Sequence, residues 1–217
     1  MEERYVAKKW IFRSLKRQND CRRRERRYCE AILRGEYPLP PQSVKLAVIR
    51  HNIPNPHPRI FVETGTYYGD TVAAIKDMYS SVISIEVDEA LYKKACARFT
   101  SDKNVRIAHG DCARELPTIL ATLHEPAVFW LDGHYSGGET GKGSVEEPIL
   151  ISLNQIAALP ARELVIFIDD ARTFDGREGR PDISDVFNCI KKIDSRYIIR
   201  VQNDIIVATI VPLPIHG

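Results

Sequence analysis

The sequence predicts an α/β fold: a doubly wound, mostly parallel sheet that ends in an antiparallel hairpin and follows an N-terminal helical segment. Beyond Arg59, short apolar runs alternate with longer helical stretches, which is typical of β-α units. The last two apolar runs flank the short turn Gln202-Asn203-Asp204, so they form a hairpin. The predicted strands cover residues 60–63, 82–86, 105–108, 128–132, 164–169, 197–201 and 205–211.

Helical stretches occupy the five intervals between the first six predicted strands. They are predicted to begin near residues 71, 89, 113 and 145, and a fifth covers 183–193. Each interval is long enough for a helical crossover between parallel strands.

The N-terminal segment differs from the rest of the chain in charge. Residues 1–50 carry 14 Lys/Arg against 6 Asp/Glu, whereas residues 51–217 carry 17 against 23. We therefore predict a basic helical segment over 1–50 and a ligand-binding domain over 51–217. We expect one or two helices over residues 2–35 and a short helix over 43–51. The segment 2–35 has apolar residues at helical spacing, namely Trp10, Ile11, Leu15, Tyr28, Ile32 and Leu33. A cap, an acceptor-site lid or a homodimer contact suits this segment better than a nucleic-acid arm does.

The cysteines and the hydropathy indicate a cytoplasmic protein. The five cysteines are odd in number and form no C-x-x-C pair, so we expect reduced thiols. The sequence has no apolar run of about 18 residues and no secretory signal pattern, so we expect no contact with a membrane.

A glycine turn follows the first predicted strand. Glu63, Gly65 and Gly69 lie in the string Glu63-Thr64-Gly65-Thr66-Tyr67-Tyr68-Gly69. Tyr67 occupies the place where the dinucleotide fingerprint needs a glycine, and the turn lacks the lysine of a phosphate loop. The acidic residue before the first glycine indicates a ligand with a cationic group.

Two further strands end in acidic residues. Glu86 closes the second strand 23 residues after Glu63, where a carboxylate can accept hydrogen bonds from both ribose hydroxyls of an adenosine. Asp111 follows the third strand and could contact an adenine. The alternative is that Asp88 and Asp111 only cap the following helices and that Glu86 is a solvated strand end.

Over residues 59–211 these features resemble the class I S-adenosylmethionine-dependent methyltransferases. The resemblance implies a Rossmann-like sheet of seven strands in the order 3-2-1-4-5-7-6. It places Glu63 near the methionine amino group, Glu86 on the ribose and Asp111 at the adenine; Tyr67 departs from the usual small residue. The implied cofactor-binding residues are Glu63, Gly65, Thr66, Tyr67, Gly69, Glu86, Val87, Asp111, Cys112 and Asp132.

The fourth and fifth predicted strands also end in carboxylates. Asp132 follows one strand, and Asp169 and Asp170 follow the other; neighbouring strands lie about 5 Å apart, so the three can converge. Such hard oxygen donors suit Mg²⁺, Mn²⁺ or Ca²⁺. This half resembles the metal-dependent O-methyltransferases of the catechol and macrolide-sugar types, and an uncharacterised bacterial branch of the class. The alternative is that Asp170 braces the loop against Arg172.

A mechanism follows from these residues. Methyl transfer from a sulfonium needs an acceptor that is positioned and deprotonated, and a metal such as Mg²⁺ at Asp132, Asp169 and Asp170 would assist both. His134 is the candidate catalytic base, with Asp132 as the second candidate; the alternative is that His134 is an ordinary loop residue. The glycine-rich stretch 136–144 is either a lid that offers Lys142 to an anionic group or a solvated loop.

The leading hypothesis is therefore methyl transfer to a hydroxyl of a small molecule or sugar. An NAD-linked oxidoreductase is opposed by the missing middle glycine. A nucleic-acid methyltransferase could use the basic arm, but the sequence lacks the Asn/Asp-Pro-Pro-aromatic and Pro-Cys motifs of those enzymes. A non-enzymatic binding module on the same fold is the fourth alternative.

Overall fold

The computed structural model describes residues 2–132, 148–158 and 164–210, with side chains from residue 18 onward. The chain divides into two compact units, Met1–Ala47 and Val48–Gly217. The division falls within helix α2 (Gln42–His51), a few residues before the predicted boundary.

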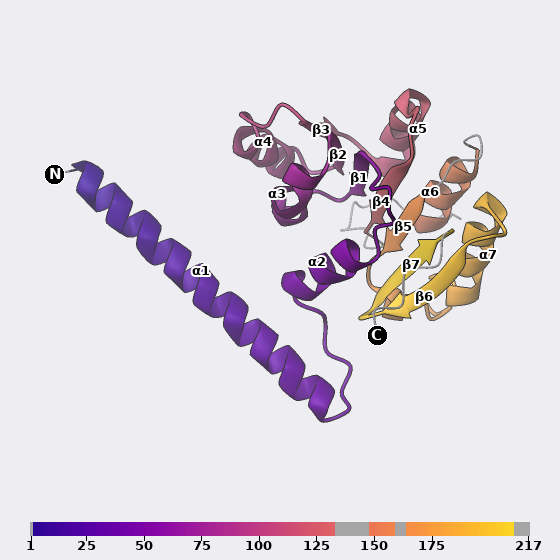
Figure 1. Ribbon diagram of the computed structural model, residues 1–217, viewed down its shortest axis with the longest axis horizontal. Helices are drawn as coiled ribbons and strands as arrows, with labels where there is room; N and C mark the ends of the chain where they lie inside the picture. Colours follow the sequence, from indigo (N-terminus) through magenta and orange to yellow (C-terminus); the bar gives the residue numbers. More distant parts are fainter. Residues whose placement is uncertain (1, 133–147, 159–163, 211–217) are drawn as a thin grey trace. The chain divides into compact units, whose positions relative to one another are not determined.

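The second unit is built on a mixed sheet. Its strands are β1 (Ile60–Thr64), β2 (Ser81–Glu86), β3 (Val105–His109), β4 (Ala127–Leu131), β5 (Val165–Ile168), β6 (Ile198–Gln202) and β7 (Ile205–Thr209) (Figure 1). The described residues form one sheet in the order β3-β2-β1-β4-β5-β7-β6. β1 to β5 pair in parallel, and β7 is antiparallel to both β5 and β6. The predicted fold, strand order and terminal hairpin are confirmed.

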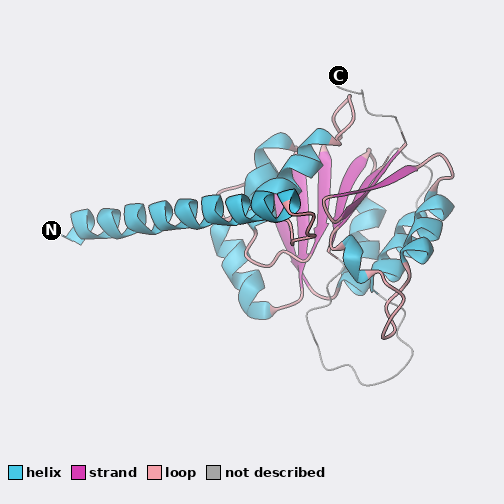
Figure 2. Ribbon diagram, turned by 90° about the horizontal axis from the view of Figure 1, so that it is seen from below, coloured by secondary structure: helices cyan, strands magenta, loops and turns pink. Residues whose placement is uncertain are grey.

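Helices cover both faces of this sheet (Figure 2). The helices of the second unit after α2 are α3 (Asp70–Ile75), η1 (Lys76–Met78), α4 (Glu89–Arg98), α5 (Cys112–Thr122), α6 (Pro148–Ala157), η2 (Ala171–Thr173) and α7 (Ile183–Ile193). On one face, α5, α6 and α7 share a buried core with Val62, Phe129 and Ile166 of the central strands. Because parallel strands are buried on both faces, β4 and β5 have no exposed position.

Aspartates fix where the helices begin. Asp88, Asp111 and Asp182 are the N-caps of α4, α5 and α7, and each carboxylate accepts a hydrogen bond from a backbone N–H of the first turn. Two of these helices follow strands directly, so the caps also fix the loops at the strand ends.

The first unit is dominated by one helix, α1 (Glu2–Leu33), which decides between the one or two helices expected there. Arg26 and Glu30 form an i,i+4 ion pair on it, with Nε and Oε1 2.8 Å apart. Among the described helices, none combines the length and the apolar composition needed to cross a membrane.

Candidate cofactor and metal site

The predicted site residues gather at one edge of the sheet. β1, β2, β4 and β5 run in parallel, so the residues that follow them emerge at the same edge. The strand order reverses between β1 and β4, the position at which doubly wound sheets bind ligands. Thr64 of β1 lies beside Leu131 of β4, which lies beside Ile168 of β5.

The glycine turn lies against the end of β4. Gly65 has φ of 86°, and its N–H and that of Thr66 both donate to the carbonyl of Ile85. A Cβ on Gly65 would lie 3.3 Å from the Cβ of Asp132, a tight contact on that side of the glycine, and the positive φ itself favours glycine. The turn and Asp132 are therefore neighbours within one site.

Gly69 has a different role at the start of α3. Its φ is 72°, and an added Cβ would lie 2.7 Å from Cε2 of Phe99. Gly69 is buried, whereas Gly65 is exposed. Packing against Phe99 thus explains the second glycine, and only the first lies open to a ligand.

Glu86 organises the turn from β2. Its Oε2 accepts a hydrogen bond from the N–H of Tyr67 at 2.7 Å, and its Oε1 accepts one from the N–H of Asp88 at 2.9 Å. Tyr67 has φ of 51°, which is rare for a bulky residue, and the bond to Glu86 stabilises it. Glu86 is 5% exposed, so it is not a solvated strand end. Each carboxylate oxygen has a second lone pair, which can accept a ribose hydroxyl.

Glu63 is buried beneath the turn. The hydroxyl of Ser84 donates to its Oε2 at 2.5 Å, and the same hydroxyl lies 2.6 Å from Oγ1 of Thr66. Burial raises the pKa of Glu63 to about 8; the hydrogen bond from Ser84 opposes this shift, and the nearby negative charge of Asp132 adds to it. A cationic ligand group above the turn would favour the ionised form of this carboxyl.

We expect the Glu63→Gln variant to be more stable than the wild type at alkaline pH. Glu63 has a pKa of about 8 when folded, against 4.5 as its ordinary value, so between these values the folded state binds the extra proton. The free energy of unfolding of the wild type then falls as pH rises through this window, by up to about 1.4 kcal/mol per pH unit from this group. Urea denaturation at pH 5, 7 and 9 measures the difference.

The exposed Glu125 offers a matched control. Glu125→Gln should leave the pH dependence of unfolding unchanged. Parallel pH profiles for wild type and Glu63→Gln would contradict the assignment of the raised pKa to this carboxyl.

The adenine side of the predicted site lies at the start of α5. Asp111 accepts a hydrogen bond from the N–H of Ala113 at 2.7 Å. It therefore caps α5, which is the role that the alternative interpretation of the sequence gave it. Burial, chiefly, raises the pKa of the neighbouring Cys112 thiol to about 12, with the charge of Asp111 adding to it. Val87 and Tyr67 are more than half exposed at the same edge. Contact of these four residues with a cofactor remains a prediction.

Asp132, Asp169 and Asp170 form the predicted carboxylate cluster. Each offers one oxygen, and these oxygens lie within 4.8 Å of one another. The N–H of Asp132 donates to Oγ1 of Thr64 at 3.1 Å, and Oδ1 of Asp169 accepts from the N–H of Asp170 at 2.9 Å. β4 and β5 end one residue before Asp132 and Asp169, and after β5 the chain turns into the left-handed region at Asp170, with φ of 53°.

The donor set fits a hard divalent cation. Asp169 is 4% exposed, and three converging carboxylates repel one another unless a cation or proton compensates them. Oxygen ligands from carboxylates match the preferences of Mg²⁺, Mn²⁺ and Ca²⁺.

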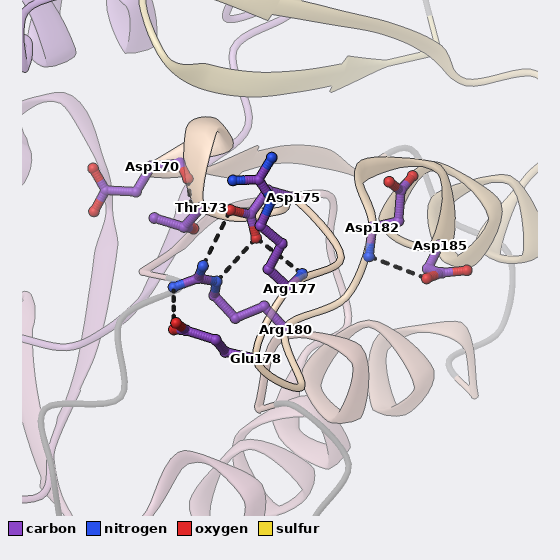
Figure 3. A network of polar contacts seen from close by, with 8 residues as sticks. All are labelled: Asp170, Thr173, Asp175, Arg177, Glu178, Arg180, Asp182 and Asp185. Carbon is purple, nitrogen blue, oxygen red and sulfur yellow. Dashed lines mark hydrogen bonds and ion pairs between the residues drawn. The ribbon is translucent and has the colours of Figure 1, made fainter.

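The loop after the cluster has its own ion pairs. Arg180 binds Asp175 and Glu178, while the carboxylate of Asp170 points away from this network (Figure 3). The alternative interpretation of the sequence was that Asp170 braces the loop against Arg172. In the structure Arg172 forms an ion pair with Asp204, with Nε and Oδ2 2.6 Å apart. The predicted base His134 and the predicted lid 136–144 with Lys142 lie outside the described residues.

The sequence does not predict a role for three polar residues at this edge, namely Thr64, Ser84 and Asp204. Ser84 had a detectable signal, because it is two residues before Glu86 in an apolar strand and so faces the same side. Thr64 and Asp204 act through contacts with distant segments, which spacing alone does not reveal.

The comparisons with known proteins identify the fold. The sequence matches no protein-family model and no curated protein. An O-methyltransferase from Bacillus cereus in complex with SAH aligns with a TM-score of 0.52 at 15% identity, over 80% of this chain and 83% of that chain. A protein from Staphylococcus aureus, described by inference as a caffeoyl-CoA O-methyltransferase, aligns with 0.51 at 15%, over 94% and 99%.

A third structure, described by inference as an rRNA methylase from Clostridium thermocellum, aligns with a TM-score of 0.51 at 12% identity, over 76% of this chain and 92% of that chain. These likenesses show that the second unit has the fold of the class I S-adenosylmethionine-dependent methyltransferases, as the sequence predicts.

Proposed function

We propose that the chain is an S-adenosylmethionine-dependent methyltransferase that transfers methyl to a hydroxyl of a small molecule or sugar with the help of a divalent cation. The observation that carries this proposal is the contact between the glycine turn and the carboxylate cluster. Gly65 and Asp132 approach so closely that a Cβ on Gly65 would lie 3.3 Å from that of Asp132. A methyl donor on the turn and an acceptor at the cluster would therefore be adjacent.

The donor side uses the residues around the turn. Glu86 would accept hydrogen bonds from the ribose hydroxyls while it retains its bonds to the N–H groups of Tyr67 and Asp88. Glu63 would supply negative charge beneath the methionine amino group, and its ionisation would accompany binding at neutral pH. The open face of Gly65 would leave room for the methionine portion.

The acceptor side uses the three aspartates. Asp132, Asp169 and Asp170 would hold a divalent cation, which when bound lowers the pKa of a hydroxyl and fixes its orientation. Asp132 lies beside Gly65 of the glycine turn, so it would also orient the acceptor toward the methyl group. We keep His134 as the proposed base, with Asp132 as the second candidate.

A methyl-transfer assay with labelled S-adenosylmethionine tests this proposal. We expect transfer to a compound with two vicinal hydroxyls, such as a catechol or a sugar, in the presence of Mg²⁺, and a loss of transfer with EDTA. Transfer that persists in EDTA would contradict the metal-assisted mechanism. Transfer to RNA alone would favour the nucleic-acid alternative.

A further inference from the structure

The turn between β6 and β7 reaches the loop that follows β5. Asn203 and Asp204 both have positive φ, 49° and 65°, and Gln202 pairs directly with Ile205. This is a two-residue hairpin turn of the kind that matches the twist of the strands. Because β7 pairs with β5 and Ile206 lies opposite Ile168, the turn lies beside the carboxyl end of β5.

Asp204 holds this loop through three hydrogen bonds. Its carbonyl accepts from the N–H of Ala171 at 2.8 Å, and its Oδ1 accepts from the N–H of Arg172 at 2.9 Å. Its Oδ2 accepts from Nε of Arg172 at 2.6 Å. The side chain of Asp204 is 8% exposed and that of Arg172 is 36% exposed, so the carboxylate is largely shielded from water.

Asp170, a member of the carboxylate cluster, directly precedes the two residues that Asp204 binds. Its φ of 53° is costly for a residue with a side chain and persists only where surrounding contacts impose it. The carbonyl of Asp170 accepts from the N–H of Thr173 at 2.9 Å and from its hydroxyl at 2.7 Å. Asp204 binds the next two residues, so both groups of contacts fix the backbone that carries Asp170.

We infer that Asp204 is a positioning residue that holds Asp170 in the geometry a divalent cation requires. The inference rests on the proposed function, since it assigns a task to Asp204 only if the cluster binds metal. Residues that orient metal ligands typically change metal affinity by 10- to 100-fold when they are removed. Asp204 binds the backbone directly after Asp170, whereas the glycine turn is bonded to Ile85 and Glu86, so the loss of Asp204 should weaken metal binding far more than cofactor binding.

The test measures the Kd of the full chain for Mn²⁺ and, separately, for S-adenosylhomocysteine. Glycine tolerates the φ of 65° at residue 204, so Asp204→Gly removes the carboxylate without adding backbone strain. We expect its Kd for Mn²⁺ to rise at least tenfold while its Kd for S-adenosylhomocysteine stays within twofold. In Asp204→Asn, an amide oxygen can still accept from the N–H of Arg172, and the Kd for Mn²⁺ should stay within threefold of the wild-type value.

Asp194 provides a matched control. It forms an ion pair with Arg196, with Oδ2 and Nη2 2.7 Å apart, and accepts a hydrogen bond from the N–H of Arg196. Asp194 precedes β6, which runs parallel to β5, so it lies at the end of the strands opposite to the carboxylate cluster. Asp194→Ala should leave the Kd for Mn²⁺ unchanged. The inference is overturned if Asp204→Gly binds Mn²⁺ as the wild type does, or if it weakens both ligands equally. A wild type that binds S-adenosylhomocysteine but no Mn²⁺ would instead overturn the proposed metal site, and the role of Asp204 with it.

Discussion

Asp169→Asn should reduce methyl transfer on the order of 100-fold, because it removes one of the three charges that would hold the cation. The amide oxygen can still accept the hydrogen bond from the N–H of Asp170, so the local backbone should be retained. One negative charge fewer also relieves repulsion in the cluster, and we expect the metal-free variant to melt at the same temperature as the wild type or above it. Methyl-transfer rates with saturating Mg²⁺ and thermal melts in EDTA measure the two effects.

Asp182→Ala is a useful control for this result. Asp182 caps α7, and the loss of such a cap costs about 1 kcal/mol of stability. We expect this variant to have a lower melting temperature than the wild type and to transfer methyl at the wild-type rate. If Asp169→Asn transfers methyl within threefold of the wild type, the aspartate cluster has no part in the reaction.

Glu86→Ala should weaken binding of S-adenosylhomocysteine by about 100-fold. The variant loses the acceptor for the ribose hydroxyls and also leaves the N–H groups of Tyr67 and Asp88 without the partner they have in the wild type. A hydrogen bond contributes about 0.5–1.5 kcal/mol to stability, so the loss of two should also make the variant less stable. Calorimetric titration gives the affinity, and urea denaturation gives the stability.

Glu89 lies three residues further along the chain and forms an ion pair with Lys93 on the exposed surface of α4. Glu89→Gln should bind S-adenosylhomocysteine as the wild type does. Equal affinities for Glu86→Ala and Glu89→Gln would show that the end of β2 does not contact the cofactor.

The sequence predicts the sheet well because its signals are local. Continuous apolar runs such as 128–131 and 165–168 mark buried parallel strands, and an acidic residue directly after each run must emerge at the same edge. The convergence of Asp132, Asp169 and Asp170 was therefore predictable, and the structure brings their oxygens within 4.8 Å of one another.

The remainder of the site depends on contacts between distant segments. Tyr67 adopts a positive φ in a place where a glycine is expected, and the hydrogen bond from its N–H to Glu86, 19 residues away, stabilises that conformation. Asp204 meets Arg172 across 32 residues through the pairing of β7 with β5. Propensity and spacing do not encode such contacts, which appear only once the strand order is known.

The central claim is that the glycine turn and Glu86 bind S-adenosylmethionine. Calorimetric titration of the full chain with S-adenosylhomocysteine, and in parallel with NAD, tests this claim most directly. We predict saturable binding of one S-adenosylhomocysteine per chain and no binding of NAD. Binding of NAD together with no binding of S-adenosylhomocysteine would contradict the account.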